Sequence, residues 1–131
     1  MSWHVNYDED TRNVRITLDG PTTGQDLRDA TSEAILTGKN HGTRAFLVDS
    51  RTIRLHASVF ALLALPDTQY TAEDADRDSL VAVLMPSDPK EQEGMRFYET
   101  VCVNRGWQAR CFWSPAEALA WLASASGAGL A

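Results

Sequence analysis

The sequence has little cysteine, little basic charge and no long apolar run. Two cysteines, Cys102 and Cys111, are too few for a disulfide framework, so a reducing, cytoplasmic setting is expected. Twelve Lys and Arg against eighteen Asp and Glu give a net charge of -6, whereas nucleic-acid and anionic-membrane surfaces select basic proteins. No stretch reaches the roughly 18 apolar residues of a membrane span. Residues 1–15 also lack the apolar segment of a signal peptide.

Familiar catalytic and metal-binding motifs are missing as well. The chain contains no G-x-S-x-G, no phosphate-binding Walker loop, no G-x-G-x-x-G and no H-E-x-x-H. Asp74, Asp76 and Asp78 have the spacing of an EF-hand start, but Ser79 replaces the required Gly and Met85 stands where the bidentate carboxylate belongs. We therefore expect no metal, no cofactor and no enzymatic activity.

What is present is a globular composition. At 131 residues and 44% hydrophobic content, the chain is long enough for one domain with a sizeable core. We expect that domain to span residues 1–123. Residues 124–131 are small and glycine-rich, and are expected to form a flexible C-terminal tail.

Five strands are predicted from apolar patterning. Two stretches alternate with period two, and two others are short continuous apolar runs typical of central parallel strands. The last alternates again and resembles an edge strand. The predicted strands cover residues 3–7, 14–18, 45–48, 80–85 and 107–113. Gly20 and Pro21 are expected to end the second of them.

Four helices are predicted from helical spacing and capping signals. Thr22 with Gln25 resembles a capping box for a helix ending near Gly38, and Ser58 is placed to cap a short helix over 59–65 that Pro66 stops. Residues 67–79 are expected to form a loop with at most a frayed helical turn. The third helix begins at Pro89 and ends at Gly106. The fourth begins after Ser114.

The order β-β-α-β-α-β-α-β-α predicts an α/β domain. Its sheet would be mixed but mostly parallel, with five strands joined by right-handed crossovers and the first strand antiparallel at an edge. The four tryptophans and both cysteines lie at core periodicity, so we interpret them as core residues. They are Trp3, Trp107, Trp113, Trp121, Cys102 and Cys111.

Ligands of such sheets usually bind beyond the carboxyl ends of the parallel strands. The strand at 45–48 is followed by a polar cluster, and alternation would place three further side chains on one side of the chain. These candidate ligand- or partner-binding residues are Asp49, Ser50, Arg51, Arg54, His56 and Ser58. An enzyme would need two titratable groups within hydrogen-bond reach, for which Asp49 and His56 are the available pair.

In this layout the chain resembles the STAS fold of anti-sigma-factor antagonists and their SpoIIAA-like relatives. The likeness covers residues 14–123. It rests on strand 14–20 leading into helix 22–38, on strand 45–48, on Asn-Arg-Gly-Trp at 104–107 and on Ser-Pro-Ala-Glu-Ala-Leu at 114–119. The resemblance implies a phosphorylatable serine at the start of the second helix, where Ser58 stands. The antagonists' Asp before and Gly after that serine are missing here, so helix capping is the favoured role of Ser58.

The resemblance implies a non-enzymatic regulatory domain of bacterial type that contacts a protein partner, alone or as a homodimer. The wider group also resembles the CRAL-TRIO lipid-carrier fold. That likeness implies the alternative function, a carrier or sensor of a small hydrophobic or acyl ligand beneath the 59–65 helix and the 66–79 loop.

Overall fold

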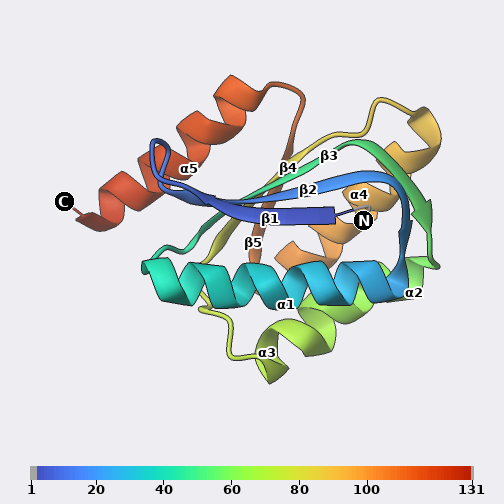
Figure 1. The fold of residues 1–131 in the computed structure, drawn as a ribbon, viewed down its shortest axis with the longest axis horizontal. Helices are drawn as coiled ribbons and strands as arrows, with labels where there is room; N and C mark the ends of the chain where they lie inside the picture. Colours follow the sequence, from blue (N-terminus) through green and yellow to red (C-terminus); the bar gives the residue numbers. More distant parts are fainter. Residues whose placement is uncertain (1–2, 131) are drawn as a thin grey trace.

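The computed structural model describes residues 3–130, except for the side chains of Val59 and of residues 125–130. Five strands form one sheet in the order β1-β2-β3-β4-β5 (Figure 1). β1 is antiparallel to β2, and the remaining neighbours are parallel, so the predicted mixed sheet is confirmed. The strands are β1 (Trp3–Asp8), β2 (Asn13–Thr23), β3 (Ala45–His56), β4 (Leu80–Leu84) and β5 (Gln108–Phe112).

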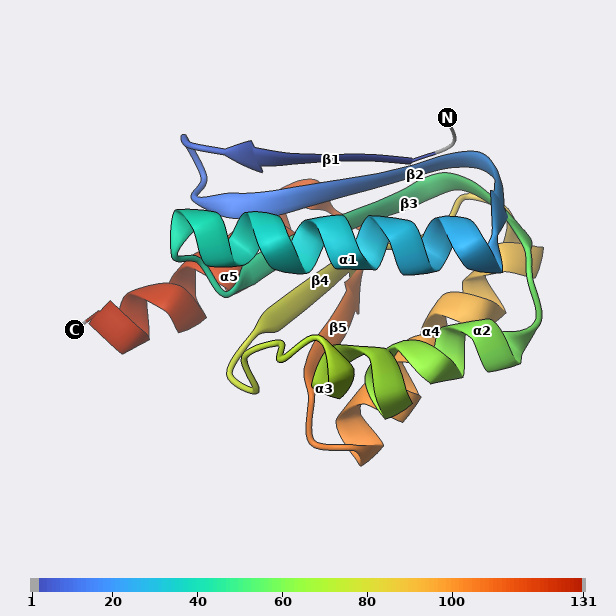
Figure 2. The same cartoon turned by 60° about the horizontal axis from the view of Figure 1, so that its bottom comes forward.

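The strand order explains how the helices are divided between the two faces. From β2 to β5 each crossover advances one strand in the same direction, and right-handed crossovers therefore place their helices on the same face. The helices of this face are α1 (Gly24–His41), α2 (Val59–Ala64), the π-helix η1 (Leu65–Gln69), α3 (Tyr70–Ala72) and α4 (Pro89–Asn104). Only α5 (Pro115–Leu130) covers the opposite face (Figure 2).

Two hydrophobic cores follow from these layers. The larger core joins α1, α2 and α4 to the sheet through side chains such as Leu27, Leu62 and Met95. The smaller core packs Ala118 and Leu122 of α5 on β3, β4 and β5.

The helix starts agree with the capping signals to within one residue. The first cap is Thr23 rather than Thr22: its hydroxyl accepts from the Asp26 N–H at 3.1 Å, and the Asp26 carboxylate accepts from the Thr23 N–H at 2.9 Å. Asp88 caps α4, and Ser114 accepts from the Glu117 N–H at the start of α5. Such caps satisfy N–H groups that a helix leaves unpaired.

Two predicted strand ends were wrong. β2 does not stop at Gly20 and Pro21, and β3 does not stop before Asp49, because the two strands continue in parallel register until Thr23 pairs with His56. Gly20 adopts a positive φ of 68°, which a residue without Cβ accepts readily, and a register shift between Thr17 and Asp19 lets the ladder continue. The polar residues after position 48 are therefore strand residues.

Residues 67–79 were predicted to be a loop after a helix stop at Pro66, but the first part of this stretch is helical. α2, η1 and α3 follow one another without a break, so residues 59–72 form a helical arm that passes through Pro66. Pro66 is the second residue of η1, so the arm changes from α-helical to π-helical geometry at a residue that has no N–H to donate.

Two large aromatic side chains lie at the surface. Trp113 was expected in the core but is 61% exposed, and Phe60, in the apolar α2 segment, is 72% exposed. Trp3, Trp107 and Trp121 do contact the two cores. The predicted flexible tail remains a prediction; α5 extends to Leu130, and Ala131 lies outside the described residues.

Candidate functional site

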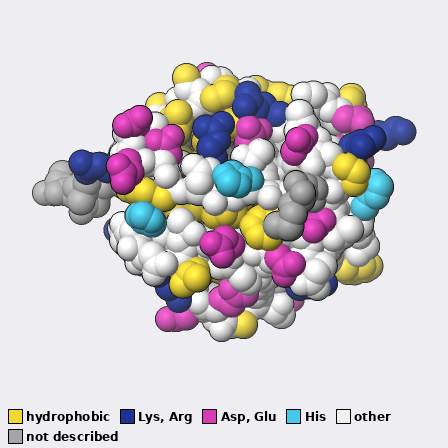
Figure 3. Space-filling view, viewed as in Figure 1, with side chains coloured by type: hydrophobic (Ala, Val, Ile, Leu, Met, Phe, Trp, Pro, Cys, Tyr) yellow, Lys and Arg dark blue, Asp and Glu magenta, His cyan; other side chains and the backbone are white. Residues whose placement is uncertain are grey.

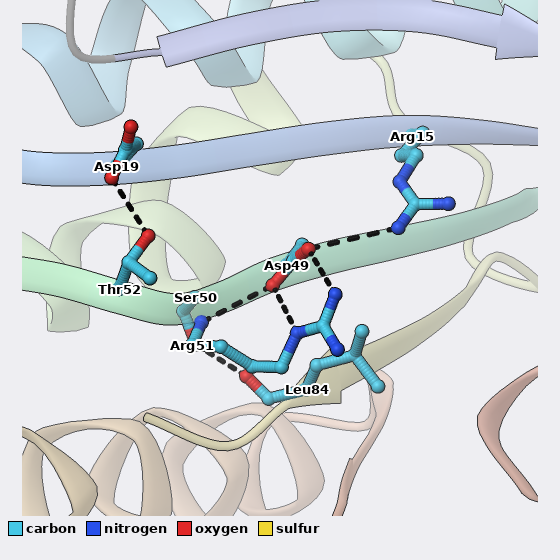
Figure 4. A network of polar contacts seen from close by, with 7 residues as sticks. All are labelled: Arg15, Asp19, Asp49, Ser50, Arg51, Thr52 and Leu84. Atoms are coloured by element: carbon cyan, nitrogen blue, oxygen red, sulfur yellow. Dashed lines mark hydrogen bonds and ion pairs between the residues drawn. The ribbon is translucent and has the colours of Figure 1, made fainter. Parts of the chain in front are cut away.

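All six predicted site residues lie on β3 or just after it, and they divide into two groups. Asp49, Ser50 and Arg51 belong to the Asp49 network, a polar cluster completed by Arg15, Asp19 and Thr52 (Figure 4). The others belong to the 54–60 segment, which runs from the end of β3 into α2 and contributes Arg54, His56, Ser58 and Phe60.

The charged groups of the Asp49 network pair with one another. The Arg51 side chain donates to both oxygens of Asp49, from Nε at 3.0 Å and from an Nη at 2.9 Å. Arg15 of β2 approaches the same carboxylate at 3.6 Å (Figure 4). The hydrogen bonds from Arg51 hold the pKa of Asp49 below its ordinary value, although partial burial opposes them. Asp49 is therefore a paired carboxylate, poorly suited to proton transfer near neutral pH.

Neighbouring polar groups of the network are satisfied too. Ser50 is fully buried, and its hydroxyl donates to the Leu84 carbonyl of β4 at 2.7 Å. The Thr52 hydroxyl donates to Asp19 of β2 at 2.8 Å. These contacts join β3 to both of its neighbouring strands, so this half of the predicted site holds the sheet together.

The backbone of the 54–60 segment is held from both sides up to His56. β2 pairs with it through Pro21, Thr22 and Thr23. β4 ends opposite Asp49, and beyond that point the first turn of α4 takes over: the Glu91 carboxylate accepts from the Leu55 N–H at 3.0 Å.

The polar side chains of the segment, by contrast, make no contact of this kind within the described residues. Arg54, His56 and Ser58 are exposed, and among the described residues no ion pair or side-chain hydrogen bond holds any of the three. Ser58 occupies the cap position of α2, but its side chain makes no capping bond, so the favoured capping role is wrong. A rigid backbone thus presents an arginine, a histidine, a serine and a 72% exposed Phe60 to solvent.

The structure does not bring Asp49 and His56 together. They are seven residues apart on one strand, which at about 3.3 Å per residue separates them by roughly 20 Å. A hydrogen-bonded acid–base pair between them is therefore ruled out.

An apolar cavity lies between α1 and the helical arm, beneath α2 and η1. Its volume is about 100 Å³, and its lining is almost wholly apolar. Representative lining residues are Leu27, Ala34, Leu62, Leu65, Val83 and Met95. The cavity borders an open hollow of about 770 Å³ at the end of α1, with which it shares Ile35, Phe46, Ala75 and Ser79.

The titratable groups near this cavity are held neutral by burial. The hydroxyls of Tyr70 and Tyr98 hydrogen-bond each other, and burial raises both pKa values well above the ordinary tyrosine value. Burial also raises the pKa of the Cys102 thiol to about 11 and that of Cys111 to about 12. Both thiols therefore stay protonated at neutral pH and are poor nucleophiles.

The charged residues that resemble an EF-hand start serve a different purpose. Arg44 lies 3.5 Å from Asp78 and 4.0 Å from Asp76, and the Asp78 N–H donates to Asp76.

Elsewhere on the surface, Figure 3 shows Asp and Glu side chains spread over the face in view, with hydrophobic ones among them. In residues 3–130, no helix is long and apolar enough to cross a membrane.

Comparison with known proteins places the chain by its fold, which is SpoIIAA-like, as the sequence resemblance predicted. A similar solved structure is that of an uncharacterised DUF3478-family protein from Shewanella loihica PV-4, described as having a SpoIIAA-like fold. The two chains are 17% identical, the match covers 92% of this chain and 91% of the other, and the TM-score is 0.57. Neither a family model nor a curated protein matches the sequence.

Sequence reasoning missed the β2 members of the Asp49 network and the exposed aromatic ring. Arg15 and Asp19 alternate with Val14, Ile16 and Leu18, so period two already placed them on the opposite face of β2. The local sequence did not show whether a helix would cover that opposite face of β2. Phe60 carried no signal of exposure, because the whole α2 segment is apolar.

Proposed function

We propose that this domain is a non-enzymatic regulatory module that binds a protein partner through the 54–60 segment. The observation that carries the proposal is the 72% exposed Phe60 in one segment with three exposed polar side chains that have no partner among the residues the structure describes. Aromatic and arginine side chains contribute most to protein–protein binding when they become buried. Arg54 stands on a strand that is held from both sides and Phe60 on helix α2, so the backbone that carries them is already ordered before binding.

The charges of the segment indicate what the partner would offer. Arg54 has no carboxylate partner in the described part of the chain, unlike Arg51, so a carboxylate on the partner would pair with it. Phe60 would enter an apolar pocket, which removes its ring from water. The expected partner surface is therefore an apolar depression bordered by acidic groups.

The candidate catalytic groups of the described residues are not assembled for acid–base or nucleophilic chemistry, and this supports a binding role over catalysis. Asp49 is paired with arginines, His56 lies far from it, and both cysteine thiols are protonated. The SpoIIAA-like fold is consistent with such a role, because the likeness to regulatory antagonists implies protein contacts.

Affinity capture from an extract of the host cell tests the proposal. The tagged wild-type chain should retain a partner identified by mass spectrometry, and the double variant Arg54→Ala/Phe60→Ala should lose it. The matched control is Arg110→Ala/Trp113→Ala, which removes an exposed arginine and an exposed aromatic ring from β5 and the residue after it, outside the 54–60 segment. Equal retention by the two double variants would refute the assignment of this surface.

A second candidate function, the carrier or sensor of a small apolar ligand, is favoured by the cavity beneath the helical arm. Its volume of about 100 Å³ is below the roughly 300 Å³ of typical ligand pockets. An apolar cavity of about 150 Å³ can nevertheless take up benzene or xenon. An acyl chain would require the helical arm to move away from α1.

Methyl NMR tests this candidate with benzene and decanoate as probes. If the cavity binds them, the Leu27 and Leu62 methyl signals should shift on addition, and the cavity-filling variant Ala34→Leu should abolish the shifts. Ala116→Leu on the exposed face of α5 serves as the control. Absence of shifts with both probes would leave the cavity a packing defect of the core.

A further inference from the structure

The two edges of the sheet are protected very differently. At the β5 edge, the Glu99 side chain of α4 accepts a hydrogen bond from the Cys111 N–H at 2.6 Å. That N–H is consequently unavailable to another strand. β5 also carries the exposed charged side chain of Arg110. Both are devices by which proteins prevent unwanted pairing at a sheet edge.

The β1 edge lacks such devices. Its six residues pair with β2 without a register shift, from Trp3 opposite Leu18 to Asp8 opposite Asn13. The strand contains no Pro, Gly, Lys, Arg or Glu, and Trp, Val and Tyr favour strands. Its carboxylate, Asp8, stands at the last position and accepts from the Asp10 and Thr11 N–H groups of the turn. No element within residues 3–130 lies beyond it (Figure 2). A row of backbone N–H and C=O groups is therefore free to pair.

We propose that β1 pairs antiparallel with β1 of a second copy of this chain, around a two-fold axis at Val5. Because the β5 edge is blocked, pairing of β1 with β5 of another copy, which would build an open-ended fibre, is disfavoured. Pairing of β1 with itself uses both open edges at once and closes the assembly as a dimer. The two sheets would join into one continuous sheet.

The side chains of β1 define the register. Trp3, Val5 and Tyr7 pack against the larger core, whereas His4 and Asn6 are exposed on the other face. A two-fold axis keeps each face on its own side, so odd-numbered residues must face odd-numbered ones. Centring on Val5 places Val5 opposite itself and Trp3 opposite Tyr7, which forms a cross-strand ladder of aromatic and β-branched side chains.

On the exposed face the same register places His4 opposite Asn6, so no like charges confront each other. Centring on Asn6 instead would remove Trp3 from the ladder, since Glu9 of the turn would then lie opposite it. In the first register Val5 faces Val5 of the second copy, and in the other register Asn6 faces Asn6. This dimer does not depend on the 54–60 segment, which lies on another strand.

Sedimentation over a concentration series tests the dimer. The wild type should sediment as a dimer, and His4→Lys/Asn6→Lys should dissociate it at least about tenfold more readily, because lysines then oppose lysines at two places. The control Asn104→Lys/Gln108→Lys adds the same charge to exposed positions away from β1. A monomeric wild type, or a dimer that tolerates the β1 lysines, would overturn the proposal.

Cross-linking tests the register independently. Under mild oxidation Val5→Cys should form a disulfide-linked dimer, because residues that face each other across antiparallel strands lie at about 4.5–5.5 Å between Cα atoms. His4→Cys and Asn6→Cys should not, and the wild type gives the background from its two native thiols. A dimer linked through Asn6→Cys in place of Val5→Cys would contradict the proposed register.

Discussion

The two halves of the predicted site, adjacent on the same strand, have opposite relations to the rest of the molecule. In the Asp49 network, the charged and buried polar groups are paired within the chain, and the carboxylate has two arginines. In the 54–60 segment the backbone is held up to His56 and then enters α2, but its polar side chains and Phe60 are exposed to solvent. The comparison indicates that polar residues on a strand are available to a partner only where they have no partner within the described part of the chain.

The largest expected effect is on partner binding. Phe60→Ala should weaken retention of the partner by about 30-fold, as expected for a central aromatic contact worth about 2 kcal/mol. Its free energy of unfolding should stay within about 0.5 kcal/mol of the wild type, because the ring is already exposed. Titration of the captured partner, with urea unfolding of the same samples, measures both. An unfolding loss larger than the binding loss would reverse the assignment.

Ser50→Ala should have the opposite signature. It removes the hydroxyl that donates to the Leu84 carbonyl in a fully buried position, so the free energy of unfolding should fall by about 1–2 kcal/mol. Partner binding should not change. Urea denaturation checks the first expectation and capture the second. A neutral effect on stability would mean that the buried bond contributes nothing to joining β3 and β4.

Arg51→Ala should show a smaller, pH-dependent loss of about 1 kcal/mol at neutral pH, since the arginine is partly exposed. The folded pKa of Asp49 is lowered, so the contribution is complete above the unfolded value of about 3.9 and disappears as pH falls through the lower folded value. Unfolding curves of wild type and variant should therefore converge in acid. A difference that persists unchanged below that range would exclude Asp49 as its source.

The smallest effect is expected at Ser58. Ser58→Ala should change stability by less than about 0.5 kcal/mol, since the side chain makes no cap bond, whereas Thr23→Ala should cost about 1 kcal/mol. Thermal unfolding of the pair measures the contrast. Phosphorylation of Ser58 remains a separate prediction of the STAS resemblance. Intact-mass analysis would reveal it as an increment of about 80 Da that the alanine variant lacks.

Much of the fold could be predicted because local signals agreed with it. Period-two alternation and two continuous apolar runs indicated the strands, capping residues indicated the helix starts, and the alternation of strands with helices indicated a mostly parallel sheet. The strand ends could not be predicted in the same way. Gly20 and Pro21 are local turn signals, and only the partner strand β3 shows why β2 passes through them.

The candidate site was predicted as a set of residues but not as two groups. Ile53 and Leu55 alternate with Arg54 and His56, a pattern that fits a longer β3, but three polar residues at 49–51 interrupt the apolar run before it. Asp49 pairs first with Arg51, two positions later, but its second partner, Arg15, lies 34 positions earlier and on another strand. Such a contact is a property of sheet register, which the local pattern does not reveal.

The most direct test of the central claim is an amide NMR spectrum of the isotope-labelled chain, recorded with and without host-cell extract. The account predicts that signals of residues 54–60 shift or broaden, while those of Asp49, Ser50 and Arg51 stay in place. Changes confined to the Asp49 network, or no change in the 54–60 segment while other surfaces respond, would contradict it.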